Sequence, residues 1–350
     1  MSFGQFAAIW NVDREGARAD AVALTENGAP TLKGKGYQLD GDVVAAVDVA
    51  LALGRPLLVS GEPGCGKTEL GYAIARRLGI DRLYLHSVKS NSEAGELFYT
   101  YDALSRFRAA QLRETQDGVA KAALYDDVGD YVEFQALGRA LIEAHESAAV
   151  APLLRGKHRP DPEKPTAPPR RSVVVIDEID KASKDFPNDL LHEIETMSFR
   201  VREFPGDPPP ETPPGYALSP ELRPVVLITS NEERQLPDAF LRRCIFHEIN
   251  FPEGDILKRI IASGLTARLE RMGLRGRPDR NLGDGSIADL VKLLLDFRGQ
   301  DPDKKPGIAE MLDAAALLAV SKSTDLAVVR PALAKLKRDS RILDMLTKQA

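Results

Sequence analysis

The sequence contains, at positions 57–68, the run LLVSGEPGCGKT. Gly61 and Gly66 lie five positions apart and are followed by Lys67 and Thr68, which is the pattern of a loop that wraps phosphate groups with backbone N–H groups. The apolar residues before the loop predict a buried strand, and residues 68–78 predict a helix that ends at Gly79. A helix N-terminus favours anions, so this strand, loop and helix predict an α/β fold that binds a nucleoside triphosphate.

The loop itself is the predicted nucleotide site. We expect Lys67 to contact the β- and γ-phosphates and Thr68 to ligate Mg²⁺, so the expected cofactors are ATP and Mg²⁺. Cys65 lies near a helix N-terminus, where a lowered thiol pKa would favour redox regulation, but a small residue that fits the loop is the plainer interpretation. The predicted nucleotide-binding residues are Gly61, Glu62, Pro63, Gly64, Cys65, Gly66, Lys67 and Thr68.

A second apolar run, Val173 to Ile176, is followed by Asp177 and Glu178. At the carboxyl end of a strand, Asp177 would hold the water shell of Mg²⁺, while Glu178 would orient and deprotonate an attacking water. This pair therefore predicts hydrolysis in addition to binding. The alternative is a solvated acidic turn formed by Asp177, Glu178 and Asp180.

A third run, Val225 to Ile228, leads to Asn231. An amide at this strand end could hydrogen-bond both the γ-phosphate and the attacking water. Asn is also a common turn former, so Asn231 alone is weak support for a site. The three runs are apolar throughout instead of alternating, which is typical of a parallel sheet covered by helices.

The chain divides by its proline content and its periodicity. Residues 151–171 hold six prolines and residues 204–224 hold eight, which predicts two long surface loops. After residue 252 only helical spacing occurs, as in Ile256, Ile260 and Ile261. We expect an N-terminal extension at 1–36, an α/β core at 37–252 and a small all-α lid domain at 253–350.

Composition excludes several classes of protein. The 43% hydrophobic and 28% charged content is that of a globular domain, and no apolar run is long enough to cross a membrane. The first ten residues do not form a secretory signal, so we expect a cytoplasmic protein. A net charge of −5 argues against a nucleic-acid partner, and two isolated cysteines argue against a disulfide framework or a zinc site.

The order of these motifs, with the segment Leu236 to Cys244 after Asn231, resembles AAA+ ATPases of the MoxR family over roughly residues 37–320. The resemblance implies a P-loop NTPase (AAA+) core with a parallel sheet and a helical lid, with Asn231 as sensor 1. It also implies that Arg243, or as second choice Arg242, is an arginine finger that acts in trans within a homo-oligomeric ring, most simply a hexamer. Phrases such as Ile176 to Lys181 resemble a subgroup associated with von Willebrand factor A-domain partners.

The expected function is therefore ATP-driven remodelling or chaperone-type maturation of a partner protein. The alternatives are a slow nucleotide switch or scaffold, a DNA-linked relative, and a kinase. Glu178 and Asn231 argue against a kinase, because they suit attack by water. Arg242 and Arg243 could instead be an exposed basic pair that satisfies helix carbonyls. The stretch Lys304 to Glu310 lacks the arginine that related lids carry, so either Lys305 replaces it or the lid contributes no cation. The aromatic cluster of Phe98, Tyr99 and Tyr101 could grip substrate, but packing is the preferred interpretation.

Overall fold

The computed structural model describes residues 23–31, 33–35, 37–39, 41–114, 127–164, 166–271, 282–300 and 305–321. Most of the expected N-terminal extension lies outside these residues. The described part of the chain forms two compact units. The first unit takes its residues from Met1–Thr31, Gly41–Ser60 and Ile74–Glu248, and the second from Leu32–Asp40, Gly61–Ala73 and Ile249–Ala350.

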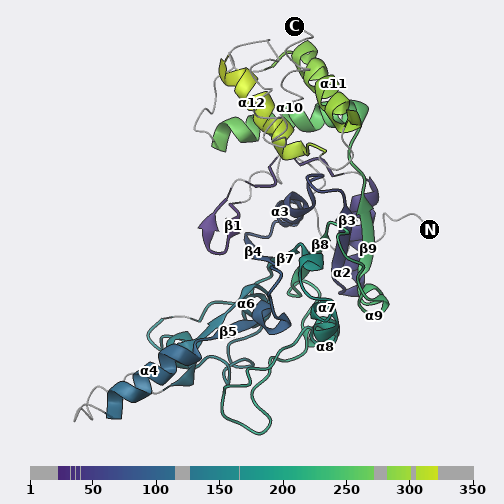
Figure 1. Ribbon diagram of the computed structural model, residues 1–350. Coiled ribbons are helices and arrows are strands. Elements are labelled where there is room, and N and C mark those ends of the chain that lie inside the picture. Colours follow the sequence, from purple (N-terminus) through teal and green to yellow (C-terminus); the bar gives the residue numbers. More distant parts are fainter. Residues whose placement is uncertain are drawn as a thin grey trace. The chain divides into compact units, whose positions relative to one another are not determined.

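A seven-stranded sheet forms the centre of the first unit, in the order β2-β1-β4-β7-β8-β3-β9 (Figure 1). Parallel pairing joins β1 to β4, β4 to β7, β7 to β8 and β8 to β3, whereas β1 and β2 pair antiparallel. A separate antiparallel pair, β5 and β6, lies outside this sheet. The bounds are β1 Thr25–Glu26, β2 Ala29–Pro30, β3 Leu57–Gly61, β4 Arg82–Ser87, β5 Tyr99–Tyr101, β6 Val132–Phe134, β7 Val173–Asp177, β8 Val225–Ser230 and β9 Ile245–Ile249.

The apolar runs found in the sequence become the central strands. β3 and β8 are buried along their whole length, and β7 is buried up to Ile176, which confirms the predicted parallel sheet covered on both faces. β4 is only partly buried, and Leu85 and His86 are half-exposed. The reason is its neighbour on the outer side, β1, which has only two residues and covers little of it.

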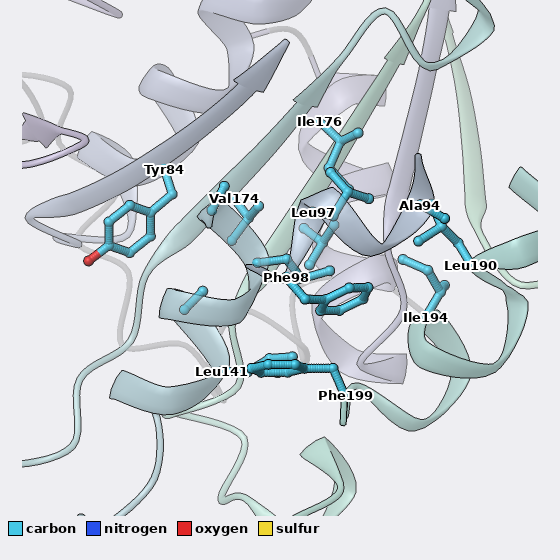
Figure 2. Close-up of a cluster of buried hydrophobic side chains, with 14 of the residues drawn as sticks. Tyr84, Ala94, Leu97, Phe98, Leu141, Val174, Ile176, Leu190, Ile194 and Phe199 are labelled. Atoms are coloured by element: carbon cyan, nitrogen blue, oxygen red, sulfur yellow. The ribbon is translucent and has the colours of Figure 1, made fainter. Parts of the chain in front are cut away.

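Helices and aromatic side chains form the core around the sheet. Phe98 is 3% exposed and its ring stacks on Phe199 with 5.3 Å between centroids, beside Val174 and Ile176 of β7 (Figure 2). Packing is thus the role of Phe98. The helices of this unit are α2 Gly41–Leu53, α4 Ala103–Glu114, α6 Ala136–Glu143, α7 Phe186–Asp189, α8 Leu191–Thr196 and α9 Asp238–Leu241, with 3-10 turns η2 Ala94–Leu97, η3 Val128–Tyr131, η4 Gly156–His158, η5 Ile179–Lys181 and η6 Gly215–Ala217.

The second unit has its own apolar core, formed by the helices α10 Gly254–Arg271, α11 Asp284–Gln300 and α12 Ile308–Ser321 (Figure 1). On α11, Ile287 and Leu290 lie three positions apart and are both buried. On α10 the expected face is confirmed at Ile261, which is fully buried, but it is wrong at Ile256, which is 47% exposed while Leu257 is fully buried in its place. The buried face continues through later leucines of α10, whereas the face of Ile256 does not stay apolar along the helix.

The two stretches that were predicted to be surface loops lie mostly at the surface. The proline-rich stretches 151–171 and 204–224 carry only the short turns η4 and η6, and most of their described residues are exposed or half-exposed. Among the described helices, none combines the length and the apolar character needed to cross a bilayer.

Candidate functional site

Three parallel strands end at one edge of the sheet, which we call the carboxyl edge. Ser60 near the end of β3 pairs with Ser230 at the end of β8, and Ile176 of β7 pairs with Ile228. Asp177 and Glu178 follow β7, Asn231 follows β8, and the predicted phosphate loop follows β3 along the chain. Clefts beyond the carboxyl ends of parallel strands are where open α/β sheets bind ligands.

Thr229 joins the two acidic residues of this edge. Its hydroxyl donates to Asp177 Oδ1 at 2.8 Å and accepts from the backbone N–H of Glu178 at 2.9 Å. Thr229 is fully buried, so these bonds form away from water and hold both residues firmly. Sequence reasoning missed this residue, and its only signal is a hydroxyl near the end of an otherwise aliphatic strand.

Glu178 has an unusual backbone conformation for a residue with a side chain. Its φ of 60° and ψ of 53° lie in the left-handed region, which costs about 1 to 3 kcal/mol and is concentrated at functional positions. Its carboxylate is held from two sides, because Oε1 accepts from Asn231 Nδ2 at 3.0 Å and Oε2 accepts from Lys181. The bond to Glu178 raises the pKa of Lys181 above its ordinary value, so Lys181 stays charged.

Asp180 is a structural part of this edge. It is 2% exposed, and its Oδ2 accepts from the backbone N–H groups of Asn231 at 3.1 Å and Glu233 at 2.9 Å. The alternative of a solvated acidic turn therefore fails for Asp180. Its carboxylate fixes the backbone of Asn231, and so fixes the amide that holds Glu178.

The phosphate loop has the shape that its glycines predict. Gly64 and Gly66 have φ values of +79° and +97°, a region that suits glycine, and α3 (Lys67–Arg77) begins directly after them. Lys67 is 6% exposed, and its ammonium donates to the carbonyls of Gly61 at 2.7 Å and Glu62 at 3.0 Å. A buried ammonium beside glycine backbone at the start of a helix fits a polyphosphate group.

Cys65 does not fit the redox alternative. Its side chain is buried at 3% exposure, and burial raises the pKa of its thiol, so the group is protonated at neutral pH. A small buried residue that fits the loop is the interpretation that the structure supports. The neighbouring Gly61 is equally constrained, since a Cβ at this position would lie 2.3 Å from the carbonyl oxygen of Ile249.

Glu62 connects the phosphate loop to residues at the ends of the lid helices. Its carboxylate accepts from Lys305 Nζ at 2.7 Å and from Arg298, and these contacts lower the pKa of Glu62, with the bond to Lys305 as the largest cause. The backbone N–H of Ile308 also donates to Gly64 O at 2.9 Å. Two cations of the second unit therefore pair with Glu62, and Arg298 is one that sequence reasoning missed. Lys304 lies outside the described residues.

Arg243 lies at the opposite, amino edge of the sheet. It precedes β9, whose first residue, Ile245, donates its N–H to Pro56 O at 2.8 Å, just before β3 begins. The Arg243 guanidinium donates to Glu195 Oε2 at 3.1 Å and to Ala239 O at 2.9 Å. Within one chain, the sheet thus separates Arg243 from Glu178.

A cleft of about 250 Å³ opens beside Arg243. Arg55 and Arg223 also line it, together with Glu195 and the 70% exposed Tyr216. Arg223 donates to Tyr216 O at 3.2 Å, which places a second guanidinium on the wall of the cleft. The surroundings of Arg243 are thus rich in positive charge.

Comparison with known proteins agrees with this geometry. Residues 57–253, more than half of the chain, match the model of the ATPase family associated with various cellular activities (AAA). The chain belongs to the AAA family. The matched range contains the phosphate loop, both strand ends of the carboxyl edge and Arg243.

Single proteins that are similar to this AAA chain share only part of its sequence or a low sequence identity. A segment of 73 residues, 21% of the chain, is 37% identical to RuvB-like 2 from Caenorhabditis elegans, of which it covers 16%. The solved structure of C. elegans PCH-2 is similar over 84% of this chain and 66% of that chain, with 16% sequence identity and a TM-score of 0.39.

Arg242 differs from Arg243 in this AAA core. Its side chain is exposed, and its backbone ends α9 and accepts at its carbonyl from Arg55 at 3.4 Å. Arg243 also donates to a carbonyl of α9, as the alternative of a helix-capping basic pair predicts. Arg243 also forms an ion pair with Glu195 and lines the cleft, and the helix-capping alternative predicts neither of these contacts.

The two residues that the sequence predicts as Mg²⁺ ligands belong to different units of the structure. Thr68 lies in the first turn of α3 and Asp177 ends β7. No group of three or more His, Cys, Asp or Glu side chains that could hold a metal occurs among the described residues. The hydroxyl of Thr68 and the carboxylate of Asp177 are each the kind of oxygen donor that Mg²⁺ prefers, since Mg²⁺ usually keeps several waters and is bound by one or two protein oxygens and substrate phosphates.

Proposed function

We propose that this AAA protein hydrolyses ATP to ADP and phosphate at the carboxyl edge of its sheet. The observation that carries the proposal is the arrangement of Glu178, a carboxylate in a left-handed backbone conformation at a strand end, held by Thr229 and Asn231. Strain at such a position persists only when its surroundings enforce it. A carboxylate fixed in this way suits a general base for water.

The roles of the residues follow from their chemistry. Lys67 and the backbone N–H groups of the phosphate loop bind the β- and γ-phosphates. Thr68 and Asp177 would hold Mg²⁺, which would neutralise phosphate charge when bound. Glu178 takes a proton from water, the water oxygen bonds to the γ-phosphorus, and the bond from that phosphorus to the β-γ bridging oxygen breaks. ADP leaves with that oxygen, and the proton passes to the released phosphate.

In the structure, the carboxylate of Glu178 is already engaged by Asn231 and Lys181. The carboxylate has about four lone-pair positions, so Glu178 can still accept a hydrogen bond from water, and release of one of these bonds would make it a stronger base. Asn231 Nδ2 is the suitable group to release, because an amide can then donate to the γ-phosphate instead. Asn231 in this way links the presence of the terminal phosphate to the freedom of the base.

The assembly that we propose is a homo-oligomeric ring, most simply a hexamer. Arg243 lies at the amino edge and Glu178 at the carboxyl edge, so Arg243 acts on the nucleotide of a neighbouring subunit, where its charge stabilises the transferring phosphoryl group. A head-to-tail interface closes into a ring when its rotation allows it. The cation-rich cleft around Arg243 supports an anionic partner at this edge.

The biological role that we propose is remodelling or chaperone-type maturation of a partner protein in the cytoplasm. The motif order and the phrase Ile176 to Lys181 support the MoxR family and a partner with a von Willebrand factor A domain. A net charge of −5 supports a protein client over nucleic acid.

The test is to measure ATP binding by calorimetry and phosphate release in steady state, with Lys67→Ala as the control. The substitution removes a charge-assisted bond of roughly 1.5 to 3 kcal/mol, so ATP affinity should fall about ten- to more than a hundredfold. Equal affinity in the two proteins would refute the phosphate-loop assignment. Tight binding without phosphate release would favour the nucleotide switch instead.

A further inference from the structure

Glu62 places a negative charge in a loop that we propose to bind a polyphosphate. Its side chain is 39% exposed and its pKa is lowered, so it is ionised at neutral pH. Like charges a few ångströms apart repel each other strongly unless a counter-charge lies close by. A counter-charge on Glu62 would reduce this repulsion when a polyphosphate binds at the loop.

Two cations near Glu62 could do so, and they differ in how firmly they are held. The Arg298 side chain is 10% exposed, its guanidinium carbon lies 3.4 Å from the centre of the Phe251 ring, and its Nη1 donates to Pro306 O at 2.8 Å. Its Nη2 donates to Glu62. Lys305 is 37% exposed and reaches Glu62 with a flexible side chain.

We propose that Arg298 is a positioning residue of the nucleotide site, which neutralises Glu62 so that the loop accepts a polyphosphate. The inference rests on the proposed function, in which this loop binds ATP. Nη1, Nη2 and the ring-facing side of the guanidinium are all engaged by Pro306, Glu62 and Phe251. Arg298 therefore acts through Glu62, whereas Lys305 also pairs with Glu62 but is held less firmly, because its side chain is more exposed.

The inference predicts that substitutions of Arg298 and Glu62 change ATP affinity in opposite directions. Arg298→Gln leaves the Glu62 carboxylate poorly compensated beside the phosphates, so ATP affinity should fall about tenfold or more. Glu62→Gln removes the repulsive charge and should keep or improve affinity. The double variant Glu62→Gln/Arg298→Gln has neither charge, and its affinity should return to within a few-fold of the wild type.

Arg268→Gln is the matched control. Arg268 pairs with Asp313 between α10 and α12, so the control removes the same kind of side chain from the same helical unit without touching Glu62. Its ATP affinity should equal that of the wild type. Arg298→Lys keeps the charge and should lose less affinity than Arg298→Gln.

The experiment is calorimetric titration of the full chain with ATP and Mg²⁺ for each variant. Loss of affinity in Arg298→Gln and its recovery in the double variant would support the inference. If Arg298 had only a structural role, or bound phosphate directly, the double variant would still lack the bonds that the guanidinium makes, and affinity would stay low. That result, or unchanged affinity in Arg298→Gln, would overturn the inference. If Lys67→Ala also bound ATP normally, the proposed function itself would fail.

Discussion

The two edges of the central sheet hold their functional side chains in different ways. At the carboxyl edge, Thr229 and Asp180 are buried and tie Asp177, Glu178 and Asn231 to one another through hydrogen bonds. At the amino edge, Arg243 is fixed by a half-exposed ion pair with Glu195, whose side chain is 63% exposed.

This difference underlies the roles proposed for the two edges, one within the chain and the other toward a neighbouring chain. Bonds within a buried polar network are strong and costly to break, so the proposed general base and its supports are pre-organised by the chain itself. An exposed ion pair contributes about 0 to 1 kcal/mol, so a stronger anion can displace Glu195 from Arg243 at little cost. The buried neighbour of Glu195, Ile194, anchors α8 in the core next to Leu190 (Figure 2).

The largest effect is expected at the carboxyl edge, from Glu178→Gln. The amide preserves the shape of the side chain but cannot accept the proton of water, so phosphate release should fall by about 10² to 10⁴-fold while ATP affinity is kept. Steady-state phosphate release and calorimetry measure the two quantities. An unchanged turnover would remove Glu178 from the mechanism.

A smaller effect, on stability, is expected from Thr229→Val. The substitution keeps the volume but leaves the buried N–H of Glu178 without its acceptor, which should lower the free energy of unfolding by about 1 to 3 kcal/mol. Ser172→Ala is the control at the amino edge, because the fully buried Ser172 hydroxyl has no hydrogen-bond partner among the residues that the structure describes. Urea denaturation should show little change for Ser172→Ala, and equal loss in both variants would contradict the contrast between the edges.

The smallest effect on the free energy of unfolding is expected from Arg243→Ala. Its ion pair is partly exposed, so the free energy of unfolding should change by less than about 1 kcal/mol. Urea denaturation of the isolated subunit measures this change. A loss as large as that of Thr229→Val would show that Arg243 is a structural cation and not an available one.

Sequence reasoning found the parts of the site that lie in contiguous motifs. The runs before Gly61, Asp177 and Asn231 became the parallel strands β3, β7 and β8, because unbroken aliphatic runs can be buried on both faces of a sheet. The glycine spacing likewise identified the phosphate loop. These signals are local, so one sequence is enough to detect them.

The parts that sequence reasoning missed depend on contacts between distant positions. Thr229 lies 52 residues from Asp177, and Arg298 lies 236 residues from Glu62. No local pattern marks a threonine in an aliphatic strand or an arginine at the end of a helix as a partner of a catalytic loop. The error on α10 has a different cause, because spacings of three and four fit two neighbouring helix faces equally well.

The central claim is that the two edges serve nucleotides of different subunits, and mixing inactive subunits tests it most directly. Arg243→Ala subunits keep the phosphate loop but lack the arginine, whereas Lys67→Ala subunits lack ATP binding but keep Arg243. The account predicts that each preparation alone releases little phosphate and that mixed rings, confirmed by mass spectrometry, regain part of the activity. Mixed rings that stay inactive, or full turnover by a monomer at nanomolar concentration, would contradict the claim.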